Sequence, residues 1–281
     1  MRADMNPVEK ALWYIESYYP HELTLDEIAR SSCVSRYHLS RASEAATGRS
    51  VMRYVRTRRL TEAARRLAGG APDILAVAIE AGYGSHEAFT RAFREQFGLT
   101  PEALRAQGHL DNLALVEPIK MDPSSLANLA PPRFEDGKLL LIAGSAERYN
   151  SDNCVTIAAQ WQRFGEYFGK VPGQVSNVAY GVCYNTDDTG NFDYLCGVEV
   201  TDFSNLPATL TRMRLPQQRY AVFPHREHIA IIRRTWMTIW AKWLPESGHT
   251  PADAPSFERY SEQFDPVTGL GGVEVWLPLK T

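Results

Sequence analysis

One short pattern occurs twice in the N-terminal part of the chain, and it constrains the fold there more than any other feature. In the first copy, Thr24 stands before an apolar helical run and Glu27 follows three residues later, which is the spacing of a capping box at a helix start. The run ends at Cys33, and Ser35 is placed to cap a second helix. A short helix, a tight turn and a second helix predict a helix-turn-helix motif.

The second copy shows the same order of signals. Asp73 can cap a helix, the glycine-rich stretch 82–84 makes the turn, and Ser85 can cap the next helix, which Gly98 ends. The apolar pattern between the copies predicts one long helix over Ser50–Ala68, which would hold the two motifs at a fixed separation. Two copies support the interpretation much better than one would.

Positive charge gathers around this connecting helix. Between Arg36 and Arg66 the sequence holds nine arginines and only two acids, Glu44 and Glu62. Such a block either binds phosphate or forms a solvated helix face, and charge alone does not decide between the two.

These residues resemble the DNA-binding domain of the AraC/XylS family of bacterial regulators, over about residues 6–107. The matching positions of the second half are Ile74, Ala78, Gly82, Tyr83, Ser85, Phe89, Arg91, Phe93, Gly98, Thr100, Pro101 and Arg105. Those of the first half are Ala29, Ser35, Leu39, Arg41, Gly48, Ser50, Tyr54, Arg59, Leu60 and Ala63. The resemblance implies an all-α domain that reads two adjacent major grooves of double-stranded DNA, about 34 Å apart.

Two positions depart from the family pattern. The family usually has a glycine where this chain has Cys33, and a phenylalanine where it has Ser43. Because positive φ is uncommon for a residue other than glycine, we expect strain at Cys33, and we expect a thinner core beneath the first recognition helix.

In a motif of this kind the second helix enters the major groove, and side chains near its N-terminus reach the base edges. Arginine can bond guanine twice, glutamate can accept from cytosine, and the threonine methyl can touch thymine. The expected base-reading residues are Arg36, Tyr37, Ser40 and Arg41 in the first motif and His86, Glu87, Thr90 and Arg91 in the second. The residues expected to contact phosphate are Arg53, Arg56, Arg58 and Arg94.

The composition changes after Ala106. The stretch 107–137 contains Pro118, Pro123, Pro131 and Pro132, and it predicts a linker followed by a first extended segment. We therefore expect a DNA-binding domain over residues 6–107, a linker over 108–117 and a second domain over 118–281.

An internal repeat with a period of 75 residues, from Trp161 to Trp236, organises the second domain. Each copy predicts strand, helix, strand, strand. The predicted strands are Leu139–Ala143, Val178–Tyr184, Tyr194–Thr201, Tyr220–Phe223, Phe257–Tyr260 and Val273–Leu279, and the predicted helices are Thr156–Phe168 and Ile229–Leu244. The fold class that follows is two domains: an all-α double helix-turn-helix, then an α+β domain of two βαββ repeats with an antiparallel sheet.

The second domain resembles the GyrI-like effector-binding domain, which some AraC-type regulators carry at the C-terminus. The matching features are the paired tryptophan-rich helices, the strand Phe257–Tyr260 and the closing segment Val275–Leu279, and they cover about residues 118–281. The resemblance implies a small-molecule site in a cleft where the two copies meet.

Glu258 is the residue that the repeat singles out. Strand alternation puts Glu258 and Tyr260 on one face, and the equivalent of Glu258 in the first copy is Cys183, whose face holds Ala179 and Gly181. Small residues opposite an acid and a phenol would leave room for a ligand, and a carboxylate among aromatic rings suits a cation. The expected ligand-binding residues are Glu258, Tyr260, Cys183, Trp161, Trp236 and Trp240. The alternatives are an exposed strand carboxylate or an internal salt bridge for Glu258, and a core role for the tryptophans.

Several sequence motifs that would indicate other classes of function are absent. The cysteines lack CxxC spacing and indicate free thiols, and the His225–His228 pair lacks a third ligand, so we expect no metal. No Walker A, GxGxxG or GxSxG motif is present, and we expect no cofactor. No apolar run reaches membrane-spanning length and no secretory signal is recognisable, so we expect a cytoplasmic protein without a membrane partner.

The leading hypothesis is a sequence-specific transcriptional regulator, not an enzyme, whose second domain binds a small effector; in its sharpest form the effector is a cationic aromatic molecule. One alternative is a hydrolase of electrophilic natural products fused to a DNA-binding domain, because some GyrI-like domains use a glutamate and aromatics in the same cavity. Another is a protein–protein interaction module, which would expose an apolar surface instead of a closed cavity. The expected partners are double-stranded DNA and the effector, with RNA polymerase as a further candidate.

Overall fold

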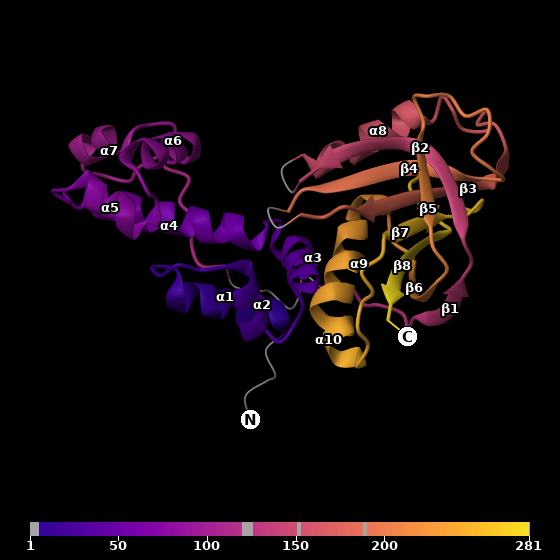
Figure 1. The fold of residues 1–281 in the computed structure, drawn as a ribbon, viewed down its shortest axis with the longest axis horizontal. Helices are drawn as coiled ribbons and strands as arrows, with labels where there is room; N and C mark the ends of the chain where they lie inside the picture. The colour runs from indigo at the N-terminus through magenta and orange to yellow at the C-terminus, as the bar shows by residue number, and fades with distance from the viewer. Residues whose placement is uncertain (1–5, 120–125, 151–152, 188–189, 281) are drawn as a thin grey trace. The chain divides into compact units, whose positions relative to one another are not determined.

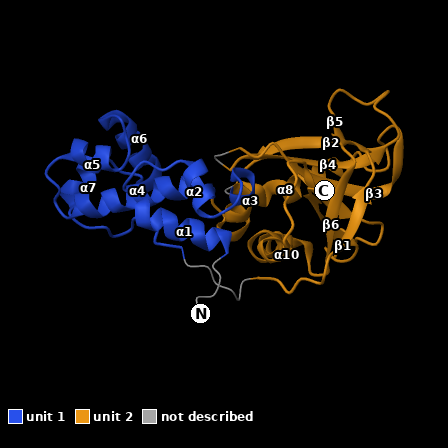
Figure 2. Ribbon diagram, turned by 60° about the horizontal axis from the view of Figure 1, so that its bottom comes forward, with its two compact units in different colours: residues 1–39, 50–121 blue, residues 40–49, 122–281 orange. Residues whose placement is uncertain are grey.

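The computed structural model describes residues 6–119, 126–150, 153–187 and 190–280, which fall into two compact units (Figure 2). Residues 1–39 and 50–121 form the first, here called the helical unit, and residues 40–49 and 122–281 form the second, the sheet unit. The elements of the chain confirm the predicted fold class, helical motifs first and an α+β domain after them.

The described helices of the N-terminal region follow the two predicted motifs along the chain. They are α1 (Pro7–Tyr18), α2 (Leu25–Ser31), α3 (Arg36–Thr47), α4 (Val51–Ala68), α5 (Ile74–Glu80), α6 (His86–Phe97) and α7 (Pro101–Gln107). Helices α2 and α3 make up the first motif and α5 and α6 the second. The long helix α4 connects them, as predicted.

Hydrogen bonds at the helix starts explain why these residues begin helices. The Thr24 hydroxyl accepts from the Glu27 N–H, and the Glu27 carboxylate accepts from the Thr24 N–H at 2.8 Å, so the predicted capping box is confirmed. The side chains of Ser35, Asp73 and Ser85 each accept from a backbone N–H in the first turn of the following helix. Each cap satisfies an N–H that a helix start otherwise leaves unbonded.

The stretch predicted as a linker is packed against the helical unit. Residues 108–117 have no helix or strand, but Leu110, Leu113 and Leu115 pack on the apolar cluster that α4 shares with the second motif. The Val116 N–H donates to the Thr61 hydroxyl of α4 at 3.0 Å. This stretch is therefore held along α4 by both apolar contacts and a buried hydrogen bond.

Among the described residues, the sheet unit contains one antiparallel sheet of eight strands (Figure 1). The strands are β1 (Arg133–Gly137), β2 (Leu140–Tyr149), β3 (Gln174–Tyr184), β4 (Phe192–Val200), β5 (Thr211–Leu215), β6 (Gln218–His225), β7 (Ser256–Tyr260) and β8 (Val273–Leu279). Their order across the sheet is β1-β6-β8-β7-β3-β4-β2-β5. The six predicted strands are all present, and β1 lies in the predicted extended segment.

The strand order gives the repeat a pseudo-twofold arrangement. Strands β2, β4 and β3 of the first copy match β6, β8 and β7 of the second, and the copies join where β3 pairs with β7. The strand before each copy pairs with the other copy: β1 with β6, and β5 with β2. The sequence did not predict β5, because the edge segment TRMRL has two arginines among five residues and too little apolar content to indicate a strand.

Each face of the sheet carries its own core. Helix α8 (Ile157–Phe164) covers one face, where Phe164 packs among residues of β2 and β4. On the other face Tyr220, Phe257 and Trp276 pack together, with ring centroids of Phe257 and Trp276 5.2 Å apart. Because strand residues alternate between faces, the helix-covered face of β7 is the one that holds Glu258.

The second predicted helix of the sheet unit is present but irregular. It starts as a 3-10 turn, η3 (Ile229–Ile231), continues as α9 (Ile232–Thr238), widens into a π-helix, η4 (Ile239–Trp243), and ends as α10 (Leu244–Ser247). Pro245 has no N–H to donate to the Ala241 carbonyl, and its ring crowds that carbonyl. The Leu244 N–H bonds the Ile239 carbonyl five residues earlier, which is the π register expected of a helix that widens ahead of a proline.

The first turn contains the strained residue that the sequence predicted. Cys33 has a φ of 59°, in the left-handed region that glycine adopts without steric cost. Its side chain is exposed and so contributes little packing. The backbone conformation of the first motif is therefore that of a glycine turn, although the residue is a cysteine.

Cys33→Gly should stabilise the helical unit by about 1 kcal/mol, because a residue other than glycine in this region costs of order 1–3 kcal/mol. The gain should appear as a higher urea midpoint of the far-UV ellipticity. Asn112→Gly is the matched control: Asn112 also has a positive φ, of 66°, but asparagine tolerates this conformation, so its gain should be smaller. A lower midpoint for Cys33→Gly than for the wild type would contradict the assignment of strain.

Candidate nucleic-acid interface and effector site

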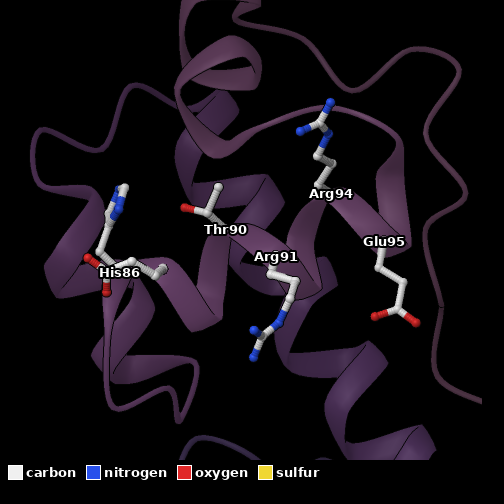
Figure 3. A pocket seen from close by; sticks show the side chains of 6 residues that line it. His86, Thr90, Arg91, Arg94 and Glu95 are labelled. Carbon is white, nitrogen blue, oxygen red and sulfur yellow. The ribbon is translucent and has the colours of Figure 1, made fainter.

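One face of α6 gathers the residues predicted to contact DNA in the second motif. A hollow of about 590 Å³ is lined by His86, Glu87, Thr90, Arg91, Arg94 and Glu95 (Figure 3). Arg91 and Arg94 are exposed, and Figure 3 shows that they point away from each other. The two guanidinium groups can therefore reach different parts of one ligand.

Two local features shape this face. The His86 imidazole Nε2 lies 2.9 Å from Glu102 Oε1 of α7, so that helix orients the ring. The Thr90 hydroxyl is buried and finds no hydrogen-bond partner among the residues that the structure describes. An unpaired buried hydroxyl costs free energy, and this oxygen is not exposed for a contact from outside the chain.

The predicted residues of the first motif divide between the two units. Arg36 and Tyr37 begin α3 in the helical unit, and the exposed Arg36 guanidinium pairs with the Asp26 carboxylate at 3.2 Å. Ser40 and Arg41 belong to the stretch 40–49, which groups with the sheet unit. A DNA contact of these four residues stays a prediction.

The arginines of α4 differ in exposure. Arg53 and Arg56 are exposed, as phosphate contacts require. Arg58 is only 3% exposed, and its guanidinium donates to both carboxylate oxygens of Glu16, at 2.9 and 3.0 Å, and to Glu62 at 3.1 Å. The prediction that Arg58 contacts phosphate is therefore wrong, since its side chain turns inward and two acids already neutralise its charge.

The ion network around Arg58 extends to the segment that leaves the second motif. The Arg58 guanidinium donates to the Val116 carbonyl at 2.8 Å. The Tyr54 hydroxyl donates to Glu16 at 2.6 Å and accepts from the Ile119 N–H at 3.1 Å. Burial raises the pKa of Tyr54, so the phenol keeps the proton that it donates. One network thus joins α1, α4 and the segment 116–119.

Arg58→Met should destabilise the helical unit by about 3 kcal/mol, because removing one partner of a buried ion pair leaves the other charge uncompensated. Arg56→Met, on an exposed position of the same helix, is the matched control and should change the free energy of unfolding by less than about 0.5 kcal/mol. Urea denaturation of both variants checks this. Equal stabilities would show that the Arg58 network contributes nothing.

Glu258 is the centre of a polar cluster in the sheet unit. It is 6% exposed, and its carboxylate accepts three hydrogen bonds: from the Trp236 indole at 2.8 Å, the Tyr194 hydroxyl at 2.9 Å and the Tyr260 hydroxyl at 2.8 Å. The Trp161 indole donates to the Tyr194 hydroxyl at 3.1 Å. The equivalent tryptophans of the two repeats therefore reach the same carboxylate, one directly and one through Tyr194.

Ionisation equilibria keep these groups in their donating forms. Burial, and then the charge of Glu258, raise the pKa of Tyr194 and Tyr260 well above 10, so both phenols are protonated at neutral pH. Burial also raises the pKa of the Cys183 thiol to about 11, so it is neutral and a poor nucleophile.

A glycine lets this cluster form. Across the strand pair, Glu258 lies opposite Gly181 and Tyr260 lies opposite Ala179, so small residues of one copy do face the acid and the phenol of the other. A β-carbon on Gly181 would lie 2.0 Å from the Tyr194 hydroxyl and 3.0 Å from the Glu258 carboxylate. The space left by Gly181 is thus filled by the Tyr194 hydroxyl.

The sequence located most of this cluster and missed one member. Tyr260, Trp161 and Trp236, which were expected to bind a ligand together with Glu258, lie in its hydrogen-bond cluster, and their contact with a ligand stays a prediction. Tyr194 was missed, although alternation along its strand and its position opposite Cys183 could have placed it on the same face. Nothing in the sequence singled out this tyrosine, because its partner Glu258 is 64 residues further along the chain and only the folded sheet brings the two together.

Cys183 and Trp240, which were also expected to bind the ligand, do not take part in the hydrogen bonds to Glu258. Cys183 is half-buried between Tyr194 and Ser256 on the neighbouring strands, and Trp240 is 1% exposed on η4. A second hollow, of about 320 Å³, lies where the end of β6 at His225 and the start of β8 meet the loop 261–272, and neither this hollow nor the one on α6 includes Glu258. The low exposure of the carboxylate and its three hydrogen bonds show that its own donors enclose it.

The remaining candidates carry no cluster of ligating groups. No group of three His, Cys, Asp or Glu residues within the described ranges has the arrangement of a metal site. The His225 ring lies 2.9 Å from the Thr235 hydroxyl and 3.2 Å from the His228 carbonyl, so both of its nitrogens have partners within the unit. Of the helices in the described part of the chain, none combines the length and the apolarity needed to cross a bilayer.

Two protein-family models match the chain. The GyrI-like small molecule binding domain matches residues 130–280, and a helix-turn-helix domain matches residues 28–107. The first covers the eight strands described above, and the second covers helices α3 to α7 with most of α2.

Relatives with similar architecture align over almost the whole chain. The chain is 22% identical over 271 residues to the Right origin-binding protein of Escherichia coli (strain K12), covering 93% of this chain and 92% of that protein. It is 23% identical over 273 residues to the transcriptional regulator Rob of Salmonella typhimurium, with the same coverage. The solved structure of SAV2435 bound to tetraphenylphosphonium has 21% identity and a TM-score of 0.43, covering 54% of this chain and 94% of that one.

Proposed function

Because the chain belongs to the GyrI-like family of small-molecule binding domains and carries an AraC-type helix-turn-helix domain, we propose that it is a one-component regulator whose effector site controls its action on DNA. The chain is a DNA-binding transcriptional regulator with a small-molecule binding domain. What the proposal adds is the identity of the reading residues and the chemistry of the effector. The observation that carries it is the Glu258 carboxylate, buried among aromatic side chains of both repeats.

The face of α6 supports a reading role for the second motif. It presents two exposed arginines and an exposed acid, Glu87, from one side of a single helix, which is the geometry of major-groove readout. The proposed base-reading residues are His86, Glu87, Thr90 and Arg91, with Arg36, Tyr37, Ser40 and Arg41 in the first motif. The proposed phosphate contacts are Arg53, Arg56 and Arg94.

Arg91→Ala should cost roughly 1–3 kcal/mol at the cognate site and relax the sequence preference there, because base contacts specify. Arg56→Ala should weaken binding to every duplex and flatten the salt dependence of the affinity. The reason is that a protein with one phosphate contact fewer releases fewer counterions from the DNA when it binds. Fluorescence anisotropy on a selected and a scrambled duplex, at several salt concentrations, separates the two. Equal losses of both variants on both duplexes would contradict these roles.

The enclosure of Glu258 defines the chemistry that we propose for the effector. A buried carboxylate attracts a cation, and the indole and phenol rings around it add cation–π attraction. The two carboxylate oxygens already accept three hydrogen bonds. The site therefore attracts a ligand through its negative charge and not by accepting a further hydrogen bond. This favours an aromatic cation whose charge is not concentrated on N–H groups. The proposed pocket residues are Glu258, Tyr260, Cys183, Trp161, Trp236 and Trp240.

Phenyltrimethylammonium should quench the tryptophan fluorescence and bind at least about tenfold more tightly than its neutral isostere tert-butylbenzene, a difference of about 1.4 kcal/mol. Glu258→Gln should bring that ratio to within about twofold, because it removes the charge and keeps the size. Glu274→Gln is the matched control, since Glu274 is an acid of β8 that pairs with Arg133 at 2.8 Å. An affinity ratio that is unchanged in Glu258→Gln would contradict the proposed cation site. The proposed DNA binding would not be affected by that result.

The proposal has three further parts, which concern catalysis, a protein partner and the location of the protein. We propose a regulator without catalytic activity, since three donors crowd the carboxylate that a hydrolase would need to activate water. RNA polymerase is proposed as a partner because a transcriptional regulator acts at promoters. Action on the chromosome of a bacterium would place the protein in the cytoplasm.

A further inference from the structure

Arg59 of α4 is bonded to the backbone at the end of α1. Its Nε donates to the Tyr19 carbonyl at 2.7 Å, and its Nη2 donates to the His21 carbonyl at 2.5 Å. Tyr19 is the C-cap of α1, where carbonyl groups lack helical partners and a cation is favoured by the helix dipole. Arg59 thus fixes the segment that leads into α2 of the first motif.

The same side chain packs against the turn of the second motif. Gly82, between α5 and α6, has a φ of +83°, and a β-carbon there would lie 2.7 Å from Arg59 Nη1. The guanidinium group therefore lies directly on the backbone of this turn. Its two hydrogen bonds on the α1 side prevent it from moving aside without loss.

We propose that Arg59 is a positioning residue that sets the separation of the two helix-turn-helix motifs, and with it the spacing of the two DNA half-sites that the protein accepts. The inference rests on the proposed reading of two grooves by one chain. Inserting one base pair moves a half-site by about 3.4 Å along the duplex and turns it by about 35°. Motifs held by a rigid spacer cannot follow such a change.

The test uses the full chain and a duplex selected from a random pool by the wild-type protein. The two half-sites are located by footprinting, and derivatives carry one base pair more or fewer between them. The wild type should lose at least about tenfold in affinity on these derivatives, and Arg59→Gln no more than about threefold. Arg66→Gln is the charge-matched control on α4, because Arg66 pairs with Glu80 on α5 in an exposed ion pair, and it should keep the wild-type penalty.

A second pair of variants tests the contact from its other side. Gly82→Ala and Gly98→Ala both force a side chain into a positive φ, but only the first meets Arg59, since nothing lies within 4 Å of Gly98. Gly82→Ala should relax the spacing penalty to about threefold or less, and Gly98→Ala should keep it. This pair decides the question if Arg59→Gln proves too unstable to assay.

Three results would overturn the inference. They are a tenfold penalty retained by Arg59→Gln, equal spacing penalties in the two glycine variants, or a wild-type protein that binds DNA with no spacing preference. Each of these leaves DNA binding by the chain intact. A wild-type protein that selects no duplex would instead count against the proposed reading of DNA itself, and the inference would fall with it.

Discussion

The buried ion network around Arg58 ties together three segments of the helical unit that are far apart in the sequence: α1, α4 and residues 116–119. A guanidinium group that is 3% exposed is tolerated because two carboxylates and a carbonyl bond it. Tyr54 and Thr61 complete the network from positions four residues before and three residues after Arg58, which lie on the same side of a helix.

Helix periodicity lets α4 serve several roles at once. The inward stripe at Tyr54, Arg58 and Thr61 holds the unit together, while Arg53 and Arg56 lie on an exposed side. Arg59 is one residue from the buried arginine and points elsewhere, to the end of α1 and the turn at Gly82. Adjacent arginines on one helix thus differ in function because each step along the helix turns the side chain by about 100°.

The sheet unit depends on a symmetry that is broken at one position. Duplication brings Trp161 and Trp236 to equivalent places above the β3–β7 junction, but the acid occurs in only one copy, as Glu258, and its equivalent is Cys183. A second carboxylate beside the first would repel it in a buried site. One acid with donors from both copies instead gives a single negative charge near the pseudo-twofold axis.

How far the sequence reached can be judged from particular residues. Caps at Thr24, Asp73 and Ser85, the glycine-like turn at Cys33 and the repeat of strands were all predicted, because each depends on a few neighbouring residues or on a simple period. Strand β5 was missed, since an edge strand with two arginines acquires its identity from its pairing with β2. Glu258 was singled out as a candidate site residue because the repeat has Cys183 at the equivalent position, whereas Tyr194 was not singled out.

The sequence by itself determined the local conformations, the order of the elements and the duplication, since backbone preferences and apolar periodicity act over short distances. Tertiary structure alone decided which partners the buried charged and polar groups meet. Helix periodicity can place Arg58 on the inward side of α4 and Arg56 on the outward side, but it does not show that Glu16 and Glu62 bond the buried guanidinium. The reason is that desolvation and its compensation depend on residues far apart in the chain, which only the folded structure brings within hydrogen-bonding distance.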